Sequence, residues 1–340
     1  MLKMPLVSII SPCFNEEGNV EACYVAVRAL FDPGGPLDAF EYEHIYADNG
    51  STDSTVSVLR RIAGADGRVR VVVNSRNYGP FRSTFNALRH AGGDAVVPML
   101  PVDLQDPVAM IVTFVKKWQE GFLRVYGIRA QRAEGAAMRF ARSAYYRLVS
   151  LLSNVEIAPG VAEFQILDRS IVAALLRHHD HYPYIRGLIA QVGFAAQSLG
   201  VEYRWMERRS GFSKNKLGNL IDQGLNGIIS TASAPLRLAM GAGFLLSLLS
   251  VIYVCIYLVT GLFSADFVFS GTAVAMALLF FLSGIQLFVL GLLGEYVSSI
   301  HSQVRRGDIV IERELINMPR RDAEGRELPV SRQDQRSDEI

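Results

Sequence analysis

The sequence predicts an α/β fold with a mostly parallel sheet, followed by a hairpin of two transmembrane helices. Residues 5–120 alternate short apolar runs with segments of helical spacing, a pattern typical of βαβ units. The apolar runs in this part end in polar loops. Residues 238–263 and 271–293 form two much longer apolar runs, and the second holds no charged residue. Each exceeds the roughly 20 residues that a hydrocarbon core of about 30 Å requires.

The amino-acid composition narrows the classes of protein to which the chain could belong. The chain has 340 residues and a mean hydropathy of +0.22, with the apolar excess concentrated in the third quarter. A formal net charge of +1 gives no reason to expect a nucleic-acid partner. Its three cysteines, Cys13, Cys23 and Cys255, are too few and too scattered for a disulfide framework or a zinc site, which fits a reducing compartment. We expect no signal segment at the N-terminus.

The individual elements follow from the spacing of apolar residues. Strands are predicted at residues 6–10, 40–47, 68–73 and 95–100. Helices are predicted between them at residues 19–30, 54–63 and 81–91, the last stopped by Gly92 and Gly93. Pro98 is awkward inside a central strand, so we expect the fourth strand to end early or to bulge there. A further short strand is predicted at residues 309–316.

The charges beside the long apolar runs predict how the hairpin is oriented. The connector, residues 264–270, holds Asp266 and no Lys or Arg, whereas Arg237 precedes the hairpin and Arg305 and Arg306 follow it. The positive-inside rule then places both flanks in the cytoplasm. We expect transmembrane helices at residues 235–263 and 270–296, a cytoplasmic segment at 297–318 and a disordered tail at 319–340. The alternative is a pair of buried helices in a soluble core.

An amphipathic segment lies before the predicted hairpin. Residues 214–234 carry apolar side chains at helical spacing and begin with Lys214 and Lys216. This pattern predicts a juxtamembrane helix after a cytoplasmic domain at residues 1–213. An ordinary helix packed on that domain has the same periodicity and remains open.

Four loops at predicted strand ends gather polar groups: residues 11–17, 48–53, 76–79 and 101–107. In open α/β sheets such strand ends hold ligands. Asp103 and Gln105 are two residues apart, and their oxygens are suited to holding a hard cation against a diphosphate. Taken singly the loops have plainer readings, because residues 48–53 also suit a turn with a helix cap and Glu16 and Glu17 suit a first helical turn.

Taken together, these loops resemble the family-2 glycosyltransferases with a GT-A fold. The chain is more closely similar to the polyprenyl-phosphate glycosyltransferases, the group of dolichyl-phosphate mannose synthase and the membrane-anchored bacterial prenyl-phosphate glucosyltransferases. The resemblance covers about residues 5–317. The matching motifs are Ser11-Pro-Cys-Phe-Asn-Glu16, Asp48-Asn-Gly-Ser-Thr-Asp53, Arg76-Asn-Tyr-Gly79, Asp103-Leu-Gln-Asp-Pro107, Arg186-Gly-Leu188 and Arg208-Arg-Ser-Gly-Phe-Ser-Lys214.

The resemblance implies an inverting transfer of one sugar from a nucleoside-diphosphate donor, with UDP preferred, to a polyprenyl phosphate. It implies a GT-A catalytic domain at the cytoplasmic face of a bacterial inner membrane and a homo-oligomer, a tetramer in the family. It also implies Mg²⁺ or Mn²⁺ held by Asp103 and Gln105. The implied nucleotide-sugar residues are Pro12, Phe14, Glu16, Asp48, Val102 and Arg129. The implied catalytic residues are Asp103, Glu163, Arg208 and Lys214, and Arg142, Arg208 and Lys214 would bind the lipid phosphate.

Six arginines between residues 124 and 147, against the single acid Glu134, fit this expectation because guanidinium groups bind phosphate oxygens. The six are Arg124, Arg129, Arg132, Arg139, Arg142 and Arg147. Some of them have the plainer reading of a solvated basic helix face. A surface loop near anionic lipid headgroups is likewise the plainer reading of Arg208 and Lys214.

The chain departs from the family pattern at two places. Pro101 stands where the family's metal motif has its first aspartate, which predicts a weaker cation affinity. Ala162-Glu163-Phe164-Gln165 replaces the usual Gly-Asp-Phe-Arg, so a carboxylate is kept at Glu163 and a positive charge is lost at Gln165.

Two other functions remain open. A processive polysaccharide synthase would share Arg204-Trp205, but Val201 occupies the place of that motif's glutamine. A non-catalytic nucleotide-sugar-binding protein is supported mainly by Pro101. The histidines at 178, 179 and 181 lie in a polar stretch typical of a loop rather than of a metal site.

Overall fold

The computed structural model describes residues 4–129, 161–177, 188–189, 192–206, 271–304 and 310–318, together with Leu245 and Ile252. The chain divides into two compact units, which are described separately. One unit comprises Met1–Gly135, Ile157–Lys214 and Gly307–Ile340, and the other comprises Ala136–Glu156 and Asn215–Arg306.

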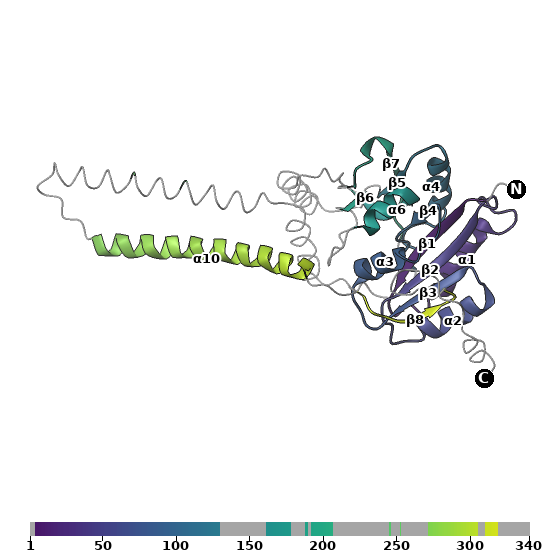
Figure 1. Cartoon of the computed structure of the whole chain (residues 1–340), viewed down its shortest axis with the longest axis horizontal. Helices are drawn as coiled ribbons and strands as arrows, with labels where there is room; N and C mark the ends of the chain where they lie inside the picture. The colour runs from purple at the N-terminus through teal and green to yellow at the C-terminus, as the bar shows by residue number, and fades with distance from the viewer. Residues whose placement is uncertain are drawn as a thin grey trace, which may run out of the picture. The chain divides into compact units, whose positions relative to one another are not determined.

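An eight-stranded sheet forms the centre of the first unit, counted over the described residues (Figure 1). Its strand order is β7-β5-β6-β4-β1-β2-β3-β8. Strands β1 to β4 are parallel to one another, whereas β6 and β8 run antiparallel to their neighbours. The strands are β1 Leu6–Cys13, β2 Glu41–Asp48, β3 Val69–Asn74, β4 Ala95–Val97, β5 Arg124–Arg129, β6 Val161–Asp168, β7 Ser198–Tyr203 and β8 Glu312–Ile316.

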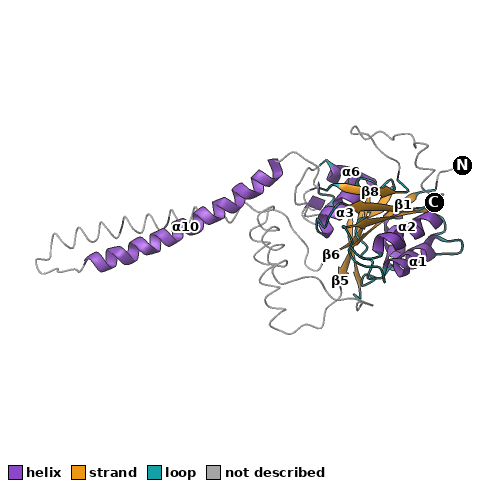
Figure 2. Ribbon diagram, turned by 90° about the horizontal axis from the view of Figure 1, so that it is seen from below, coloured by secondary structure: helices purple, strands orange, loops and turns teal. Residues whose placement is uncertain are grey.

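Helices cover both faces of this sheet (Figure 2). Ile9 packs in one core cluster with residues of α1, α2 and α4, and its neighbour Ile10 packs in the other with residues of α3 and α6. Successive side chains of a strand point to opposite faces, so a run that is apolar throughout marks a strand buried on both sides. The helices are α1 Val20–Phe31, α2 Thr55–Ala65, α3 Pro80–Leu88, α4 Met110–Gln119 and α6 Arg169–Leu176, with a short 3-10 turn at Ala195–Gln197.

The four strands and three helices predicted for residues 5–100 are confirmed, with shifted ends. Strand β4 ends at Val97, directly before Pro98, as that proline predicted. Strand β1 is longer than predicted and passes through Pro12. The carbonyl of Ile10 accepts a hydrogen bond from Leu100, so even-numbered residues of β1 turn their polar groups toward β4. Pro12, which has no N–H, falls where β4 has already ended.

The segment after the predicted hairpin returns to the sheet as β8, which confirms the strand expected within residues 309–316. It pairs antiparallel with β3. Arg60 of α2 binds Glu314 at 2.9 Å, and Asn317 donates to the carbonyls of Ala63 at 2.6 Å and Val69 at 3.0 Å. These bonds hold the C-terminal part of β8 against α2 and the start of β3.

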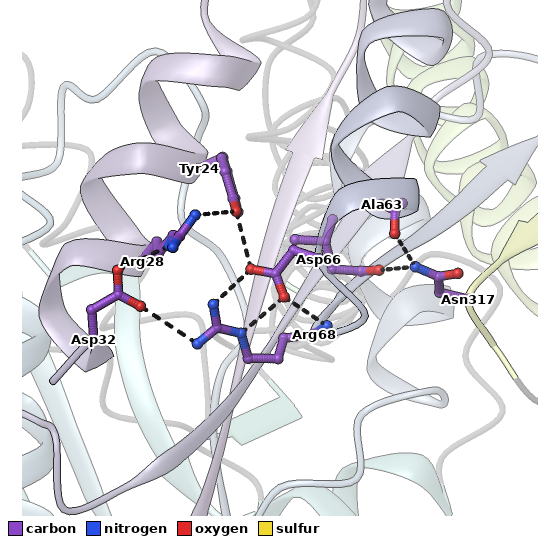
Figure 3. Close-up of polar contacts among 8 residues, drawn as sticks. Tyr24, Arg28, Asp32, Ala63, Asp66, Arg68 and Asn317 are labelled. Carbon is purple, nitrogen blue, oxygen red and sulfur yellow. Dashed lines mark hydrogen bonds and ion pairs between the residues drawn. The ribbon is translucent and has the colours of Figure 1, made fainter.

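An ion-pair network braces the same connection (Figure 3). The carboxylate of Asp66 accepts hydrogen bonds from the Arg68 side chain at 2.8 and 2.9 Å and from the Tyr24 hydroxyl at 3.0 Å. The bond from Arg68 is the main reason that the pKa of Asp66 is lowered to about 2. Arg68 also lies 3.6 Å from Asp32, so the network ties α1 to the start of β3.

In the second unit, helix α10 spans Gly271–Val304 and contains the second predicted transmembrane helix. Among the described residues, no helix meets the combined requirement of length and apolar content for a membrane span. The juxtamembrane helix, the first transmembrane helix apart from Leu245 and Ile252, and the tail lie outside the described residues. The predicted domain boundaries therefore stay a prediction.

A buried carboxylate, Glu43 of β2, joins the starts of three strands. It accepts hydrogen bonds from the Ser8 hydroxyl of β1 and, at 2.6 Å, from the amide of Gly92. Its other oxygen lies 2.5 Å from the guanidinium of Arg70 on β3. Glu43 is therefore the main polar link between strands β1, β2 and β3 at this end of the sheet.

Replacing this carboxylate should destabilise the fold. We expect Glu43→Ala to lower the free energy of unfolding by about 3 kcal/mol, the lower end of the range for a broken buried ion pair, because Arg70 is partly exposed and can reach water. Thermal and denaturant unfolding of the purified protein measure this loss. Glu41→Ala, at the exposed start of the same strand, is the control and should unfold like the original protein. Equal stabilities of the two variants would contradict the role of Glu43.

Candidate functional site

One edge of the sheet gathers most of the predicted site residues. Strands β1 to β4 end at this edge, and so do β5 and β7, because β5 and β4 both run antiparallel to β6 and β7 runs parallel to β5. Strand β6 starts there, since Asp168 at its other end pairs with Ala95 at the start of β4. The predicted residues in or beside these strand ends are Pro12, Phe14, Glu16, Asp48, Val102, Asp103, Gln105, Arg129 and Glu163. Arg142, Arg208 and Lys214 lie outside the described residues.

The loops after β1 and β2 are joined by hydrogen bonds. The amide of Asn15 donates to the Ser51 hydroxyl at 2.9 Å, and the Asn15 side-chain oxygen accepts from the amide of Thr52 at 2.8 Å. The amide of Glu16 donates to the hydroxyl of Thr55 at 2.8 Å. Asn15 adopts a φ of 53°, a left-handed conformation that asparagine tolerates better than most residues. Residues 48–55 therefore shape the loop that holds Phe14 and Glu16, whereas the N-cap residue of α2, Ser54, makes no side-chain capping bond.

Asp48 ends β2 with a fully buried carboxylate. One of its oxygens accepts hydrogen bonds from the amides of Gly50 at 3.2 Å and Ser51 at 3.1 Å. Burial raises the pKa of Asp48, and the hydrogen bonds from Ser51 and Gly50 oppose only part of this rise. The carboxylate is thus fixed in orientation beside Cys13, its register partner on β1.

The third loop is pressed against the second. The side chain of Asn49 accepts a hydrogen bond from the amide of Tyr78 at 2.9 Å and donates to Asn77 at 2.8 Å. Gly50 has a φ of +75°, and a Cβ there would lie 2.7 Å from the carbonyl carbon of Arg76. Only glycine meets both the conformation and the close approach without strain. The motif at residues 76–79 therefore serves to support the Asp48–Asp53 loop as well as to form part of the edge.

The fourth loop brings Asp103 and Gln105 together in a tight turn. An Asp103 carboxylate oxygen accepts from the amide of Gln105 at 3.2 Å, and Leu104 between them has a φ of 57°. No group of three or more His, Cys, Asp or Glu side chains that could hold a metal occurs among the described residues. A carboxylate and an amide oxygen still suit Mg²⁺ or Mn²⁺, because such hard cations are commonly held by one or two protein oxygens plus substrate phosphates.

Arg129, predicted beside the donor diphosphate, is engaged in an ion pair with Asp106. Its guanidinium donates to both carboxylate oxygens at 3.2 Å each and lies 5.0 Å from the ring of Trp205. Burial acts to lower the pKa of Arg129, but the charges and hydrogen bonds of Asp106 and Tyr203 together outweigh it, so the pKa lies above its ordinary value. Sequence reasoning missed Asp106, because its partners lie 23 residues away at Arg129 and 97 residues away at Tyr203 and leave no local pattern.

On β6, Glu163 and Gln165 are both buried. Arg124 of β5 donates to the Gln165 side-chain oxygen at 2.9 Å and lies over the ring of Tyr126 at 4.7 Å. Of the six arginines between residues 124 and 147, only Arg124 and Arg129 are described. Arg124 has a structural role between β5 and β6, which is neither the phosphate binding nor the solvated basic helix face that the sequence suggested.

Comparison with known proteins identifies the family of the chain. Residues 8–175 match the model of glycosyl transferase family 2, and residues 234–300 match that of the GtrB C-terminal hairpin. The chain is 31% identical to the uncharacterized glycosyltransferase YkcC of Bacillus subtilis, over 88% of this chain and 90% of the relative. It is also 31% identical to the SfII prophage-derived bactoprenol glucosyl transferase of Shigella flexneri, over 88% of this chain and 94% of the relative.

The chain therefore belongs to the family-2 glycosyltransferases and is an enzyme. Within them it belongs with the polyprenyl-phosphate glycosyltransferases, as its motifs predicted. Among solved structures, glucosyl-3-phosphoglycerate synthase from Mycobacterium tuberculosis shares 21% identity and a TM-score of 0.44 over 66% of this chain and 78% of that one. That likeness is too distant to carry any argument about this site.

The contact between the second and third loops can be tested at Gly50. We expect Gly50→Ala to destabilise the protein by at least about 1–2 kcal/mol, the usual cost of a left-handed L-residue, because the methyl group also meets the Arg76 backbone. Gly64→Ala is the control, since Gly64 lies in α2 with open space around it, and we expect it to be neutral or slightly stabilising. Thermal unfolding of the two variants measures the difference. A Gly50→Ala variant as stable as the original protein would show that the loops tolerate separation.

Proposed function

We propose that the enzyme transfers one sugar from a UDP-linked donor to a polyprenyl phosphate, with inversion, at the cytoplasmic face of the bacterial inner membrane. The observation that carries this proposal is that a buried carboxylate, the tight turn of Asp103 and Gln105, and a second buried carboxylate lie at one edge of the sheet: Asp48, Asp103 and Glu163. The name of the Shigella flexneri relative, a bactoprenol glucosyl transferase, supports a polyprenyl carrier as the acceptor.

Within this proposal the first two loops bind the nucleotide. Pro12, Phe14 and Glu16 contact the base and ribose, together with Asp48, whose carboxylate is already fixed by backbone amides. Val102 lines the site beside them, and Arg129 lies near the donor phosphates. Asp103 and Gln105 would hold Mg²⁺ or Mn²⁺ against the diphosphate, and such a cation would supply positive charge to neutralise the leaving nucleoside diphosphate.

The acceptor needs little activation, because a phosphate monoester is already an anion at neutral pH. An acceptor oxygen attacks the anomeric carbon as the bond from that carbon to the diphosphate oxygen breaks on the opposite face, which inverts the configuration. Positioning and charge screening then supply most of the rate. Glu163 orients the acceptor, and Arg142, Arg208 and Lys214 bind its phosphate. Arg208 and Lys214 also stabilise the charge that moves between the phosphates.

Pro101 limits how the cation is held. Asp106 is only 2% exposed and is engaged by Arg129 and Tyr203, so it does not replace the missing carboxylate. The cation therefore depends on Asp103, Gln105 and the donor diphosphate. We expect its affinity to be low without nucleotide and higher with it.

The membrane part of the proposal concerns residues 214–296. Two transmembrane helices at residues 235–263 and 270–296, preceded by a juxtamembrane helix, would bring the acceptor phosphate to the catalytic domain. The match of residues 234–300 to the GtrB C-terminal hairpin supports this arrangement. A homo-oligomer, a tetramer as the family resemblance suggests, is part of the same proposal.

Cysteine labelling tests the topology. Cys13 and Cys23 are buried, so a Cys255→Ala background suits single added cysteines. In right-side-out vesicles we expect a membrane-impermeant maleimide to label Ala265→Cys in the connector. Ser302→Cys should react only after the vesicles are opened. Equal labelling of both positions in sealed vesicles would overturn the proposed hairpin.

Transfer itself is tested with membranes containing the enzyme, labelled nucleotide sugars, a polyprenyl phosphate and Mg²⁺ or Mn²⁺. We expect a lipid-soluble, mild-acid-labile product. Asp103→Ala should lower the rate by more than about 100-fold, beyond the range for residues that act through a metal ligand. Asp38→Ala is the control, since Asp38 is exposed and lies before β2, at the opposite edge of the sheet.

Each outcome of this assay discriminates between functions. A long polymer as product would indicate a processive synthase instead. Nucleotide binding without transfer from any donor would indicate a non-catalytic binding protein. Near-normal activity of Asp103→Ala would contradict the assignment of the cation to this turn.

A further inference from the structure

A cluster of three side chains, the buried Asp106 and Tyr203 and the partly buried Arg129, adjoins the turn of Asp103 and Gln105. Asp106 follows that turn and is 2% exposed. Its carboxylate accepts hydrogen bonds from Arg129 at 3.2 Å and from the hydroxyl of Tyr203 at the end of β7. The same hydroxyl accepts from Arg129 Nε at 3.1 Å. Each member of the cluster therefore contacts the other two.

The end of β7 also holds the backbone of the turn. The amide of Met206 donates to the carbonyl of Gln105 at 2.9 Å. On the other side, the amide of Leu100 donates to Ile10 of β1 at 2.8 Å. Residues 101–105 are thus fixed at both ends, by β1 before the turn and by residues 203–206 after it.

The buried charge of Asp106 makes the hydrogen bond from Tyr203 important. Burial, and then the neighbouring carboxylate of Asp106, raise the pKa of Tyr203, so its hydroxyl stays protonated and donates. Without that donor the Asp106 carboxylate would lose one of the hydrogen bonds that hold it in a buried position, and a buried carboxylate with fewer partners moves toward water. Because Asp106 is joined to Gln105 by one peptide bond, such a movement would displace the Gln105 side chain.

We propose that Tyr203 is a positioning residue for the cation turn: it holds Asp106, and through it sets where Asp103 and Gln105 point. The nature of the cation in this proposal rests on the proposed function, whereas the positioning of the turn does not. Residue 206 directly precedes the segment with Arg208 and Lys214, so the same strand end also leads into the loop proposed to bind the lipid phosphate.

The first test measures positioning in the free full-length protein. We expect Tyr203→Phe to speed hydrogen–deuterium exchange of the amides at residues 102–105 by about 10-fold, the factor that corresponds to losing one hydrogen bond to a charged group. Tyr42→Phe is the matched control. Tyr42 is 4% exposed against 5% for Tyr203, and the described residues offer no hydrogen-bond partner to its hydroxyl.

The second test measures cation binding. In the presence of UDP we expect Tyr203→Phe to raise the dissociation constant of Mn²⁺, determined by calorimetry, by about 10-fold or more, as for other residues that orient a metal ligand. In steady-state transfer the Mn²⁺ concentration for half-maximal rate should rise in step, while KM for the polyprenyl phosphate stays unchanged. A merely structural role would lower the unfolding temperature without moving either Mn²⁺ constant.

These measurements separate the two proposals. If no donor is transferred but exchange at residues 102–105 responds as expected, the proposed function fails and the role of Tyr203 stands. If exchange and Mn²⁺ affinity of Tyr203→Phe match those of Tyr42→Phe, the role of Tyr203 is overturned. Should Tyr203→Phe fail to fold, Asp106→Asn replaces it, with faster exchange expected and unchanged exchange contradicting the proposal.

Discussion

The parallel pairing of β1 between β4 and β2 is the constraint on which the rest of the site depends. It sets Cys13 opposite Asp48 and brings Leu100 beside Ile10, so three loops leave the sheet at one level. Hydrogen bonds then join these loops to one another, as between Asn15 of the first loop and Ser51 and Thr52 of the second. A slip of one residue in this register would turn Asp48 to the other face of the sheet and undo each of these bonds.

The partners of the carboxylates at this edge bear on the proposed cation site. Of the acids at this edge, Asp48 is bound by backbone amides and Asp106 is paired with Arg129, and the proposed cation site has Asp103 as its carboxylate. The Asp106–Arg129 pair also offsets part of the positive charge that Arg129 would bring to the proposed donor phosphates. With Pro101 in the place of a second aspartate, the proposed cation site would depend more on its substrate's own negative charge than a site with two aspartates would.

The sequence predicted those parts of the fold whose signals are local. Apolar runs and turn residues mark β1 to β4 and the helices between them, and Pro98 marks the end of β4. The loops could be recognised because their residues are adjacent in the chain. The partnership of Asp106 with Arg129 and Tyr203 could not, because it forms only when β5 and β7 pair and bring residues far apart in sequence to one edge. Arg124 shows the converse, since a cluster of arginines suggested phosphate binding while its contacts are with Gln165 and Tyr126.

Strand β8 connects the loops of the site to a distant part of the chain. The polypeptide leaves the first unit for the hairpin region and returns to pair with β3, whose end carries the third loop. The carbonyl of Ile311 accepts a hydrogen bond from Ser75 at 2.9 Å, and its amide donates to the Tyr78 hydroxyl at 3.4 Å. Glu312 next to it accepts from Asn86 at 2.7 Å and lies 2.6 Å from His90. The segment that begins at Val310 therefore supports the third loop. The third loop in turn contacts Asn49 and Gly50. The loop that follows Asp48 thus depends on segments from both halves of the chain.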